Sequence, residues 1–417
     1  MKKIFFLLSL LMATNVKAQF DFAAPFSDGL ARVTTNGKNG FIDKNGNMVV
    51  PAIYDAASNF HEGLSRVRIE RKWGFIDNNG NMVIPAIYFL ADDFNEGFSA
   101  VTTMDKKHGF IDRNGNMIIP AIYGNTDSFS DSVAIVWKDH RCGIIDKNGN
   151  MFATVNYDSI RTTDLFHEGL AGIESKNRHI GFINKTGQLI VPAIYDKASP
   201  FHEGLALVSK GGKYGFLDKT GQLAIPLIYE HAESFSEGLA IVRINRKTGF
   251  IDKTGQLVVP AIYNGGWNFS EGLAMVNKDG KCGCIDKTGR LVIQCKYEAL
   301  QPFHEGLAAA VINGKCGFID QTGNVAIPFI YDWIMDGTSM LSFSYFSEGF
   351  APVCKNGKWY YIDKQGNTLN INTQSVNGNI TNPSNNGNIR VQSGNEILNG
   401  KVKKAVRFLN TLNQILR

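Results

Sequence analysis

The sequence lacks long hydrophobic runs after residue 20, and nothing there approaches the roughly 18 consecutive apolar residues of a membrane-spanning helix. We therefore expect no transmembrane span. The chain also lacks a Gly-x-Ser-x-Gly motif, a phosphate-cradling glycine loop and zinc-ligand spacing. The sequence accordingly predicts no catalytic residues, no cofactor site and no metal site.

Cysteine is sparse, with six in 417 residues, which is too few for a dense disulfide framework. Cys142, Cys282 and Cys316 occupy one recurring position. A free, buried thiol acts as a small apolar side chain, and this is the expected state of the cysteines. A Cys282–Cys316 bridge between neighbouring units is the alternative, if their Cα atoms lie within about 7 Å.

Excess positive charge is missing from the central part of the chain. The formal net charge is +5, but Lys2, Lys3 and Lys17 lie at the N-terminus and six further basic residues lie in 370–417. The region between is slightly acidic. A nucleic-acid binder concentrates positive charge on its main body, so no nucleic-acid partner is expected.

The first eighteen residues have the pattern of a secretory signal peptide. Lys2 and Lys3 precede an apolar run over 4–12, and Val16-Lys17-Ala18 is a small-residue cleavage site. Cleavage after Ala18 predicts an exported protein that is periplasmic, displayed on the cell surface or secreted. No cysteine lies at that junction, so a lipid anchor is not indicated.

What the sequence does contain is one unit of roughly 34 residues, repeated ten times between residues 26 and 366. A phenylalanine opens every unit: Phe26, Phe60, Phe94, Phe129, Phe166, Phe201, Phe235, Phe269, Phe303 and Phe346. Each unit has three short strand-like runs, as in 239–242, 249–252 and 257–263, with β-branched and aromatic residues. Repeats of this length bury their apolar faces against their neighbours.

The third run of each unit is apolar throughout, as in Val258-Val259-Pro260-Ala261-Ile262-Tyr263. Such a run predicts a strand buried on both faces, and its proline predicts an edge position. An Asp-Lys-Asn-Gly or Asp-Lys-Thr-Gly turn, as at 43–46, precedes it with the composition of a type I turn.

The fold class is therefore all-β: a tandem array of ten three-stranded meanders. Ten units exceed the usual 4–8 blades of a propeller, and the fourth and last units depart from the pattern, with Ser132 and Tyr360 replacing glycines. These features favour an open, curved stack. A closed propeller-like ring is the alternative.

Composition changes after the repeats. The repeat domain is expected over 19–369, and an Asn/Gly-rich linker over 370–399. Residues 400–417 predict a short basic amphipathic helix that caps the array, docks a partner or makes weak contact with a membrane surface.

The motif Lys72-Trp73-Gly74-Phe75-Ile76-Asp77, with Ile-Pro-x-Ile-Tyr and Phe-x-Glu-Gly-Leu-Ala around it, resembles the WG-repeat (KWG-repeat) family of bacterial proteins over about residues 20–366. The resemblance implies a β-rich repeat protein, often exported, with no common catalytic residues and a binding or scaffold role. The Trp position varies strongly along the chain. We call this position the variable slot, and the residues that occupy it in the ten units are Asn39, Trp73, His108, Cys142, Ile180, Tyr214, Thr248, Cys282, Cys316 and Trp359.

The recurrent acids do not predict an active site. A glycosidase needs two carboxylates in different environments, whereas an acid copied into every unit, such as Glu62 or Asp77, meets nearly the same environment each time. Four histidines, His61, His167, His202 and His304, fill the variable place of Phe-x-Glu-Gly, where Ser236 and Asn95 also occur. That tolerance predicts exposed turn residues.

The leading functional hypothesis is an exported, non-catalytic binding or scaffold protein for protein or glycan partners in the cell envelope. Trp73, His108, Tyr214 and Trp359 are its candidate binding residues if the variable slot faces outward; if it faces inward, the variation reflects core packing. One alternative is a hydrolase acting on envelope material, with its site at the irregular segment 331–346, which carries Trp333, Asp336 and Tyr345. Another is a surface structural component that self-associates.

Overall fold

The computed structural model describes residues 20–139, 141–155, 161–162, 165–333 and 344–371. They belong to the first of two units of the chain, Met1–Thr373. The predicted signal peptide, most of the predicted linker and the predicted helix 400–417 lie outside the described residues.

All regular secondary structure in this part of the chain is antiparallel β-strand, in nine four-stranded sheets and one two-stranded sheet. The first five sheets are β1 (Phe22–Ser27), β2 (Leu30–Thr35), β3 (Lys38–Asp43) and β4 (Met48–Tyr54); β5 (Ala56–Ala57), β6 (Leu64–Ile69), β7 (Lys72–Asp77) and β8 (Met82–Tyr88); β9 (Leu90–Ala91), β10 (Phe98–Thr102), β11 (His108–Asp112) and β12 (Met117–Tyr123); β13 (Asn125–Thr126), β14 (Val133–Lys138), β15 (Arg141–Asp146) and β16 (Met151–Val155); β17 (Arg161–Thr162), β18 (Leu170–Glu174), β19 (Ile180–Asn184) and β20 (Leu189–Tyr195).

The remaining sheets are β21 (Lys197–His202), β22 (Leu205–Lys210), β23 (Lys213–Asp218) and β24 (Leu223–Tyr229); β25 (His231–Ala232), β26 (Leu239–Ile244), β27 (Lys247–Asp252) and β28 (Leu257–Tyr263); β29 (Gly265–Gly266), β30 (Leu273–Lys278), β31 (Lys281–Asp286) and β32 (Leu291–Tyr297); β33 (Ala299–Leu300), β34 (Leu307–Ile312), β35 (Lys315–Asp320) and β36 (Val325–Asp332); and β37 (Phe350–Lys355) with β38 (Lys358–Asp363). Each four-stranded sheet is a meander in chain order. The prediction of three strands per unit was therefore one short: a strand, in most units of two residues, precedes the repeated phenylalanine.

The core lies between successive sheets. Eight of the ten repeated phenylalanines pack their rings, edge-on or tilted, against a phenylalanine of the preceding sheet, as Phe94 does on Phe75 with ring centroids 4.9 Å apart. Phe235 packs on Phe216 in the same way, at 4.8 Å. Such pairs contribute about 0.5–1.5 kcal/mol each beyond the apolar area that they bury. No sheet buries its apolar faces alone, as the repeat pattern predicted.

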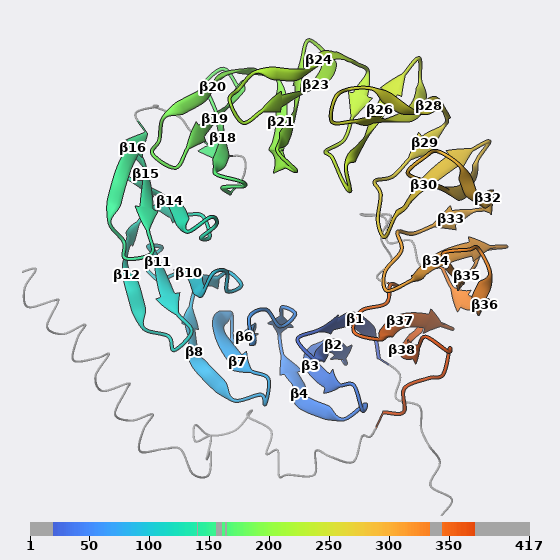
Figure 1. Ribbon diagram of the computed structural model, residues 1–417. Helices are drawn as coiled ribbons and strands as arrows, with labels where there is room; N and C mark the ends of the chain where they lie inside the picture. The colour runs from blue at the N-terminus through green and yellow to red at the C-terminus, as the bar shows by residue number, and fades with distance from the viewer. Residues whose placement is uncertain (1–19, 140, 156–160, 163–164, 334–343, 372–417) are drawn as a thin grey trace, which may run out of the picture. The chain divides into compact units, whose positions relative to one another are not determined.

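The described residues between 20 and 371, taken by themselves, close into a ring (Figure 1). Phe20 and Trp359 exchange backbone hydrogen bonds at N···O distances of 3.3 and 3.1 Å. The Tyr361 hydroxyl donates to the Ala24 carbonyl oxygen at 2.6 Å, and Lys358 pairs with Asp21 at 3.0 Å. The favoured open stack was therefore wrong, and the closed, propeller-like alternative is confirmed.

This closure explains the aberrant last unit. In eight of the other nine units the variable slot pairs with a tyrosine at the end of the fourth strand, as Trp73 pairs with Tyr88. The last unit has no such strand, and Phe20 from the start of the ring takes that place opposite Trp359. The last repeat differs because the N-terminal segment completes it.

The fourth strand of each four-stranded sheet is an edge strand on the outer side of the ring (Figure 1), as the proline that seven of the nine contain predicted. It is not buried on both faces, because neighbouring sheets diverge with distance from the centre of the ring. One isoleucine of this strand is 42–59% exposed in seven sheets: Ile53, Ile87, Ile122, Ile194, Ile228, Ile262 and Ile330. Proline removes a backbone donor from this edge and so limits strand addition by other chains.

Candidate binding surface

The variable slot lies on the third strand of each sheet, where it contributes to packing between neighbouring units. Asn39, Cys142, Thr248, Cys282, Cys316 and Trp359 are buried, while Trp73, His108 and Tyr214 are half-buried. The four candidate residues belong to four different sheets, through β7, β11, β23 and β38, and are not gathered into one site. Their role in binding stays a prediction, but Trp359 is clearly a core residue at 8% exposure.

Among these positions, Trp73 is distinguished by two arginines that lie beside its ring. The guanidinium carbons of Arg66 and Arg68 lie 5.2 and 5.6 Å from its ring centroid, within the range of cation–π attraction. Arg66 also pairs with Asp93 of the next sheet, Nε to Oδ1, at 3.1 Å. The result is an aromatic ring with two cationic neighbours at the boundary between two sheets.

Sequence reasoning missed both arginines, although a signal was present. Arg66 stands at a strand position that most units fill with apolar residues, and only Arg32 repeats the exception. The other members are Ala100, Ile135, Gly172, Leu207, Ile241, Met275, Ala309 and Pro352. A charged residue at a position that is otherwise apolar is evidence of a local departure from the repeat.

His108 and Tyr214 have polar surroundings of their own. The Thr102 hydroxyl lies 3.3 Å from His108 Nδ1, and burial lowers the pKa of His108, against a smaller opposing effect of Asp92. His108 is therefore neutral at pH 7. The Tyr214 ring lies 5.4 Å from the His231 ring, and Lys197 donates to its hydroxyl at 3.5 Å.

The recurrent glutamates hold the ring together. Each lies in a two-residue turn, here called the Glu-Gly turn, in which both residues have positive φ, for example 52° at Glu237 and 88° at Gly238. Hairpin turns of type I′ have this property. The side chain accepts a hydrogen bond from a backbone N–H of the following unit in every case: Asp28 from Gly63, Glu62 from Gly97, Glu96 from Ser132, Asp131 from Gly169, Glu168 from Gly204, Glu203 from Gly238, Glu237 from Gly272, Glu271 from Gly306, Glu305 from Gly349 and Glu348 from Gly29.

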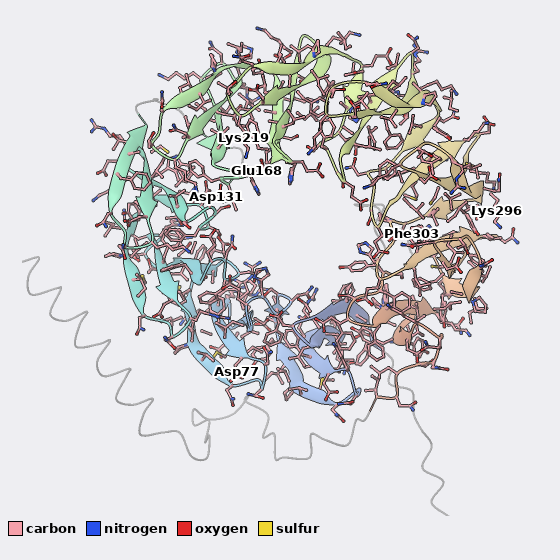
Figure 2. All side chains as sticks on the ribbon, in the orientation of Figure 1. Asp77, Asp131, Glu168, Lys219, Lys296 and Phe303 are labelled. Carbon is pink, nitrogen blue, oxygen red and sulfur yellow. The ribbon has the colours of Figure 1, made fainter. Side chains whose placement is uncertain are left out.

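A lysine of the following unit reaches the same carboxylate in most units. Lys219 lies 2.8 Å from Glu168, both on the inner side of the ring in Figure 2, and Lys287 lies 3.1 Å from Glu237. Lys44 pairs with Glu348 at 2.8 Å, so the first and last units join by the contact used everywhere else. These acids are positioned for assembly of the ring.

Replacing Glu237 tests this assignment. We expect Glu237→Ala to lower the free energy of unfolding by about 1–2 kcal/mol, because a charge-assisted hydrogen bond is lost. Glu237→Gly loses the same bond but adopts positive φ without strain, so it should be less destabilising. Urea denaturation measures both variants. Equal stability of Glu237→Ala and the parent would refute the structural role.

The turn aspartates are hydrogen-bond acceptors within their own turns. Asp286 accepts bonds from the Thr288 hydroxyl at 2.6 Å and from Arg290 Nε at 3.0 Å. The Thr288 bond, with further bonds from Arg290 and the turn backbone, lowers the pKa of Asp286 to about 2. An aspartate in an unfolded chain titrates near pH 3.9. This stabilisation is therefore complete above about pH 4 and is lost as the pH falls towards 2.

We therefore expect Asp286→Asn to make unfolding less pH-dependent between pH 4 and pH 2, measured as denaturation midpoints along a pH series. The chain supplies its own precedent for folding, because Asn184 occupies this position in the fifth unit and accepts the Gln188 amide at 2.9 Å. The reverse change, Asn184→Asp, should steepen the dependence. An unchanged pH profile in both variants would contradict the assignment.

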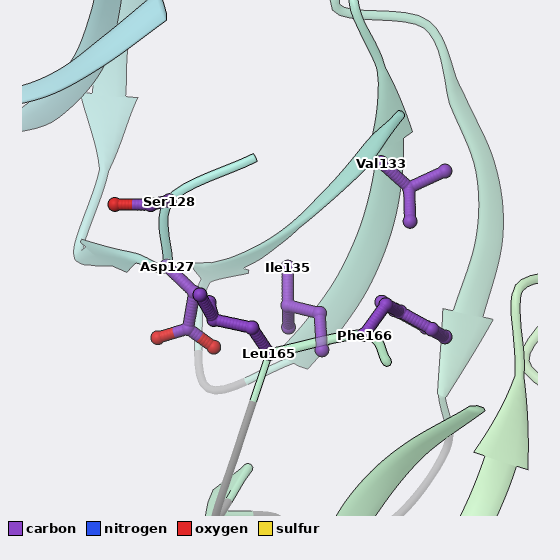
Figure 3. Close-up of a pocket in the computed structure, with 6 residues that line it drawn as sticks. All are labelled: Asp127, Ser128, Val133, Ile135, Leu165 and Phe166. Carbon is purple, nitrogen blue, oxygen red and sulfur yellow. The ribbon is translucent and has the colours of Figure 1, made fainter. Parts of the chain in front are cut away.

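The irregular segment of the hydrolase hypothesis is only partly described. Asp336 lies outside the described residues; Trp333 is half-buried, and the Tyr345 ring packs on His304 with centroids 4.7 Å apart. Elsewhere, Asp127, Ser128, Val133, Ile135, Leu165 and Phe166 line a surface hollow (Figure 3) with about 0 Å³ of room for a water-sized molecule. Small-molecule sites typically have about 300–1,000 Å³.

The cysteines are free thiols, five buried and Cys295 half-buried. This is the expected state, and the alternative Cys282–Cys316 bridge is not formed. Within the described residues, no group of three or more His, Cys, Asp or Glu side chains is placed to hold a metal ion. No helix among them is long and apolar enough to span a membrane.

Comparison with known proteins adds the family. No curated protein matches the sequence. Similar solved structures include a eukaryotic initiation factor (12% identity, 70% of this chain and 93% of that chain, TM-score 0.46), BamB from Moraxella catarrhalis (12%, 75% and 95%, 0.34) and the computationally designed Ika8 protein (14%, 65% and 95%, 0.34).

The "WG containing repeat" family matches the chain in consecutive segments: residues 14–38, 40–73, 73–107, 109–139, 143–178, 180–214, 214–247, 249–282, 283–316, 317–338 and 342–359. These segments cover most of the chain and include the described sheets. The protein belongs to the WG containing repeat family.

Proposed function

We propose that this protein is an exported, non-catalytic binding or scaffold module for protein or glycan partners in the cell envelope. The proposal rests on a difference between two sets of residues, the constant acids of the Glu-Gly turns and the residues of the variable slot. The constant acids are occupied in inter-unit hydrogen bonds all round the ring. Chemical variety is concentrated in the slot and its neighbours, where recognition can change without disturbing the ring.

The Trp73 cluster, composed of Trp73, Arg66 and Arg68, is the strongest candidate contact. Tryptophan and arginine are the residue types that dominate binding energy in protein interfaces, and Trp73 remains half-buried. A second candidate is Tyr214 with His231 and Lys197. An aromatic ring beside a cation suits a partner that offers an apolar surface and an acidic group, whether a peptide or a glycan.

Export is part of the proposal and rests on the N-terminal pattern of residues 1–18. Mass spectrometry of the protein recovered from the envelope fraction tests it. The expected mature N-terminus is Gln19. Recovery of an uncleaved chain from the cytosol would reject export.

A pull-down from envelope extracts tests binding, using residues 19–417 and the same chain without 400–417 to detect docking through the C-terminal segment. We expect Trp73→Ala to reduce capture of a specific partner at least fivefold while the variant stays folded. Thr248→Ala, at the same slot of another sheet but buried, is the control for general effects on the slot. Capture that falls equally in both variants, or only together with loss of folding, would defeat the recognition role of Trp73.

A further inference from the structure

One residue lies between the repeated phenylalanine and the acid of the Glu-Gly turn, and this residue is of two kinds. In six units it is Ser or Asn, and its side chain donates a hydrogen bond to the carbonyl oxygen of the phenylalanine of the next unit. The pairs are Ser27–Phe60 (2.9 Å), Asn95–Phe129 (2.7 Å), Ser130–Phe166 (2.5 Å), Ser236–Phe269 (2.9 Å), Ser270–Phe303 (3.0 Å) and Ser347–Phe26 (2.8 Å). This bond is a second link across the gap between neighbouring sheets.

The other four units have histidine there, and two of these units are adjacent. His167 belongs to the sheet β17–β20 and His202 to the sheet β21–β24, and their ring centroids are 5.9 Å apart with an interplanar angle of 35°. The pair spans the same kind of gap that the Ser–carbonyl bonds span elsewhere. His61, in contrast, has Ser27 and Asn95 at this position in the units on either side.

Both imidazoles are accessible: His202 is exposed and His167 is half-buried. The charged groups beside them are already paired, Glu168 with Lys219 at 2.8 Å and Glu203 with Lys253 at 3.0 Å. The two histidines are thus adjacent surface donors that are not themselves used in the repeated inter-unit bonds. Sequence tolerance at this position correctly indicated turn residues, but it did not show that two of them meet.

The spacing of the two rings fits shared coordination. With Zn–N bonds of about 2.0–2.1 Å and ring centroids roughly 1.1 Å behind the ligating nitrogens, two imidazoles on one tetrahedral ion have centroids about 5–6 Å apart. We propose that His167 and His202 bind a divalent late first-row cation, represented by Zn²⁺, which links the two sheets. Solvent completes the coordination.

Competition from the thiols is small at neutral pH. Burial raises the pKa of Cys142, Cys284 and Cys316 to about 12, and the thiolate, not the thiol, is the metal ligand. Neutral imidazole is the ligand form of histidine, so binding at this site weakens on acidification.

Isothermal titration of residues 19–417 with Zn²⁺ tests the proposal. We expect one saturable site whose affinity falls at least tenfold in His167→Ser and in His202→Ser. His61→Ser, an exposed histidine at the same turn position without a neighbouring imidazole, should retain the affinity of the parent. Serine is native to this position in five other units, so these variants are expected to fold.

A thermal readout separates the site from adventitious binding. Saturating Zn²⁺ should raise the Tm of the parent and of His61→Ser, because a ligand that binds only the folded state stabilises it. It should leave the Tm of His167→Ser and His202→Ser unchanged. Absence of saturable binding in the parent, undiminished affinity in the two variants, or an equal loss in His61→Ser would overturn the proposal.

Discussion

Gly249→Ala is expected to destabilise the protein by about 3 kcal/mol or more, because the added methyl group has nowhere to go. A Cβ at Gly249 would lie 2.6 Å from the Val259 carbonyl oxygen and 2.8 Å from the Ala261 nitrogen. Both are backbone atoms of the neighbouring strand. Relieving such contacts requires the edge strand to move, and overpacking of this kind costs about 1–3 kcal/mol even where side chains can yield. Urea denaturation of the two proteins measures the difference.

The fourth unit provides the matched control. Gly143 is the equivalent glycine, but its Cβ would meet the side chain of Met151, with Cε at 2.6 Å, and no backbone atom is among its three nearest neighbours. Methionine has several rotatable bonds and adapts to small changes in packing. We expect Gly143→Ala to cost about 1 kcal/mol or less. Similar losses at Gly143 and Gly249 would show that backbone crowding is not the cause.

The contrast between these two glycines follows from the register of the fourth strand. In the seventh unit Thr248 pairs with Tyr263 and Phe250 with Val259, so residues 260–262 bulge over Gly249. The fourth unit lacks this bulge, and there Gly143 pairs in regular register with Thr154. The eighth unit has Gln294 in place of the proline and keeps the bulge, so the proline is not its cause. The last unit lacks the strand altogether, which leaves room for Tyr360 in place of glycine. Crowding at the glycine therefore depends on the bulge of the fourth strand.

Trp359→Ala is the second change for which a large effect is expected, about 3–5 kcal/mol in the free energy of unfolding. Trp359 is 8% exposed and packs with Phe20 and Phe22 where the ends of the ring meet. Its loss removes side-chain contacts from both halves of the closure. Urea denaturation reports the stability, and limited proteolysis near residues 20–35 reports opening at this point.

Trp73→Ala is the control, because Trp73 fills the same slot in a continuous part of the ring and is only half-buried. We expect it to lose less than half as much stability and to show no new cleavage near residues 20–35. If the two variants were equally destabilised and equally resistant to protease there, the closure would not depend on Trp359. The pair also separates the two roles of the slot, core packing at Trp359 and exposed chemistry at Trp73.

The candidate surface was only partly predictable from sequence. Aromatic residues in a varying position singled out Trp73 and Tyr214, because variation beside a constant glycine is visible in the sequence itself. Their neighbours were not predictable, because Arg66 and Arg68 lie on a different strand from Trp73 and reach its ring only through strand pairing. The same holds for His167 and His202, which are separated by a whole repeat but face one gap.

The sequence alone determined three of the four strands of a typical unit from the apolar runs, the turns from Asp-x-x-Gly and Glu-Gly, and in most units an edge strand from proline. These are local consequences of backbone geometry and side-chain shape, so each repeat encodes them separately. Tertiary structure alone decided that the array closes, because closure depends on the small rotation between successive sheets summed over all of them, which no single repeat contains. It also decided that Phe20 completes the last unit, since two segments far apart in the chain meet only after the ring has turned full circle.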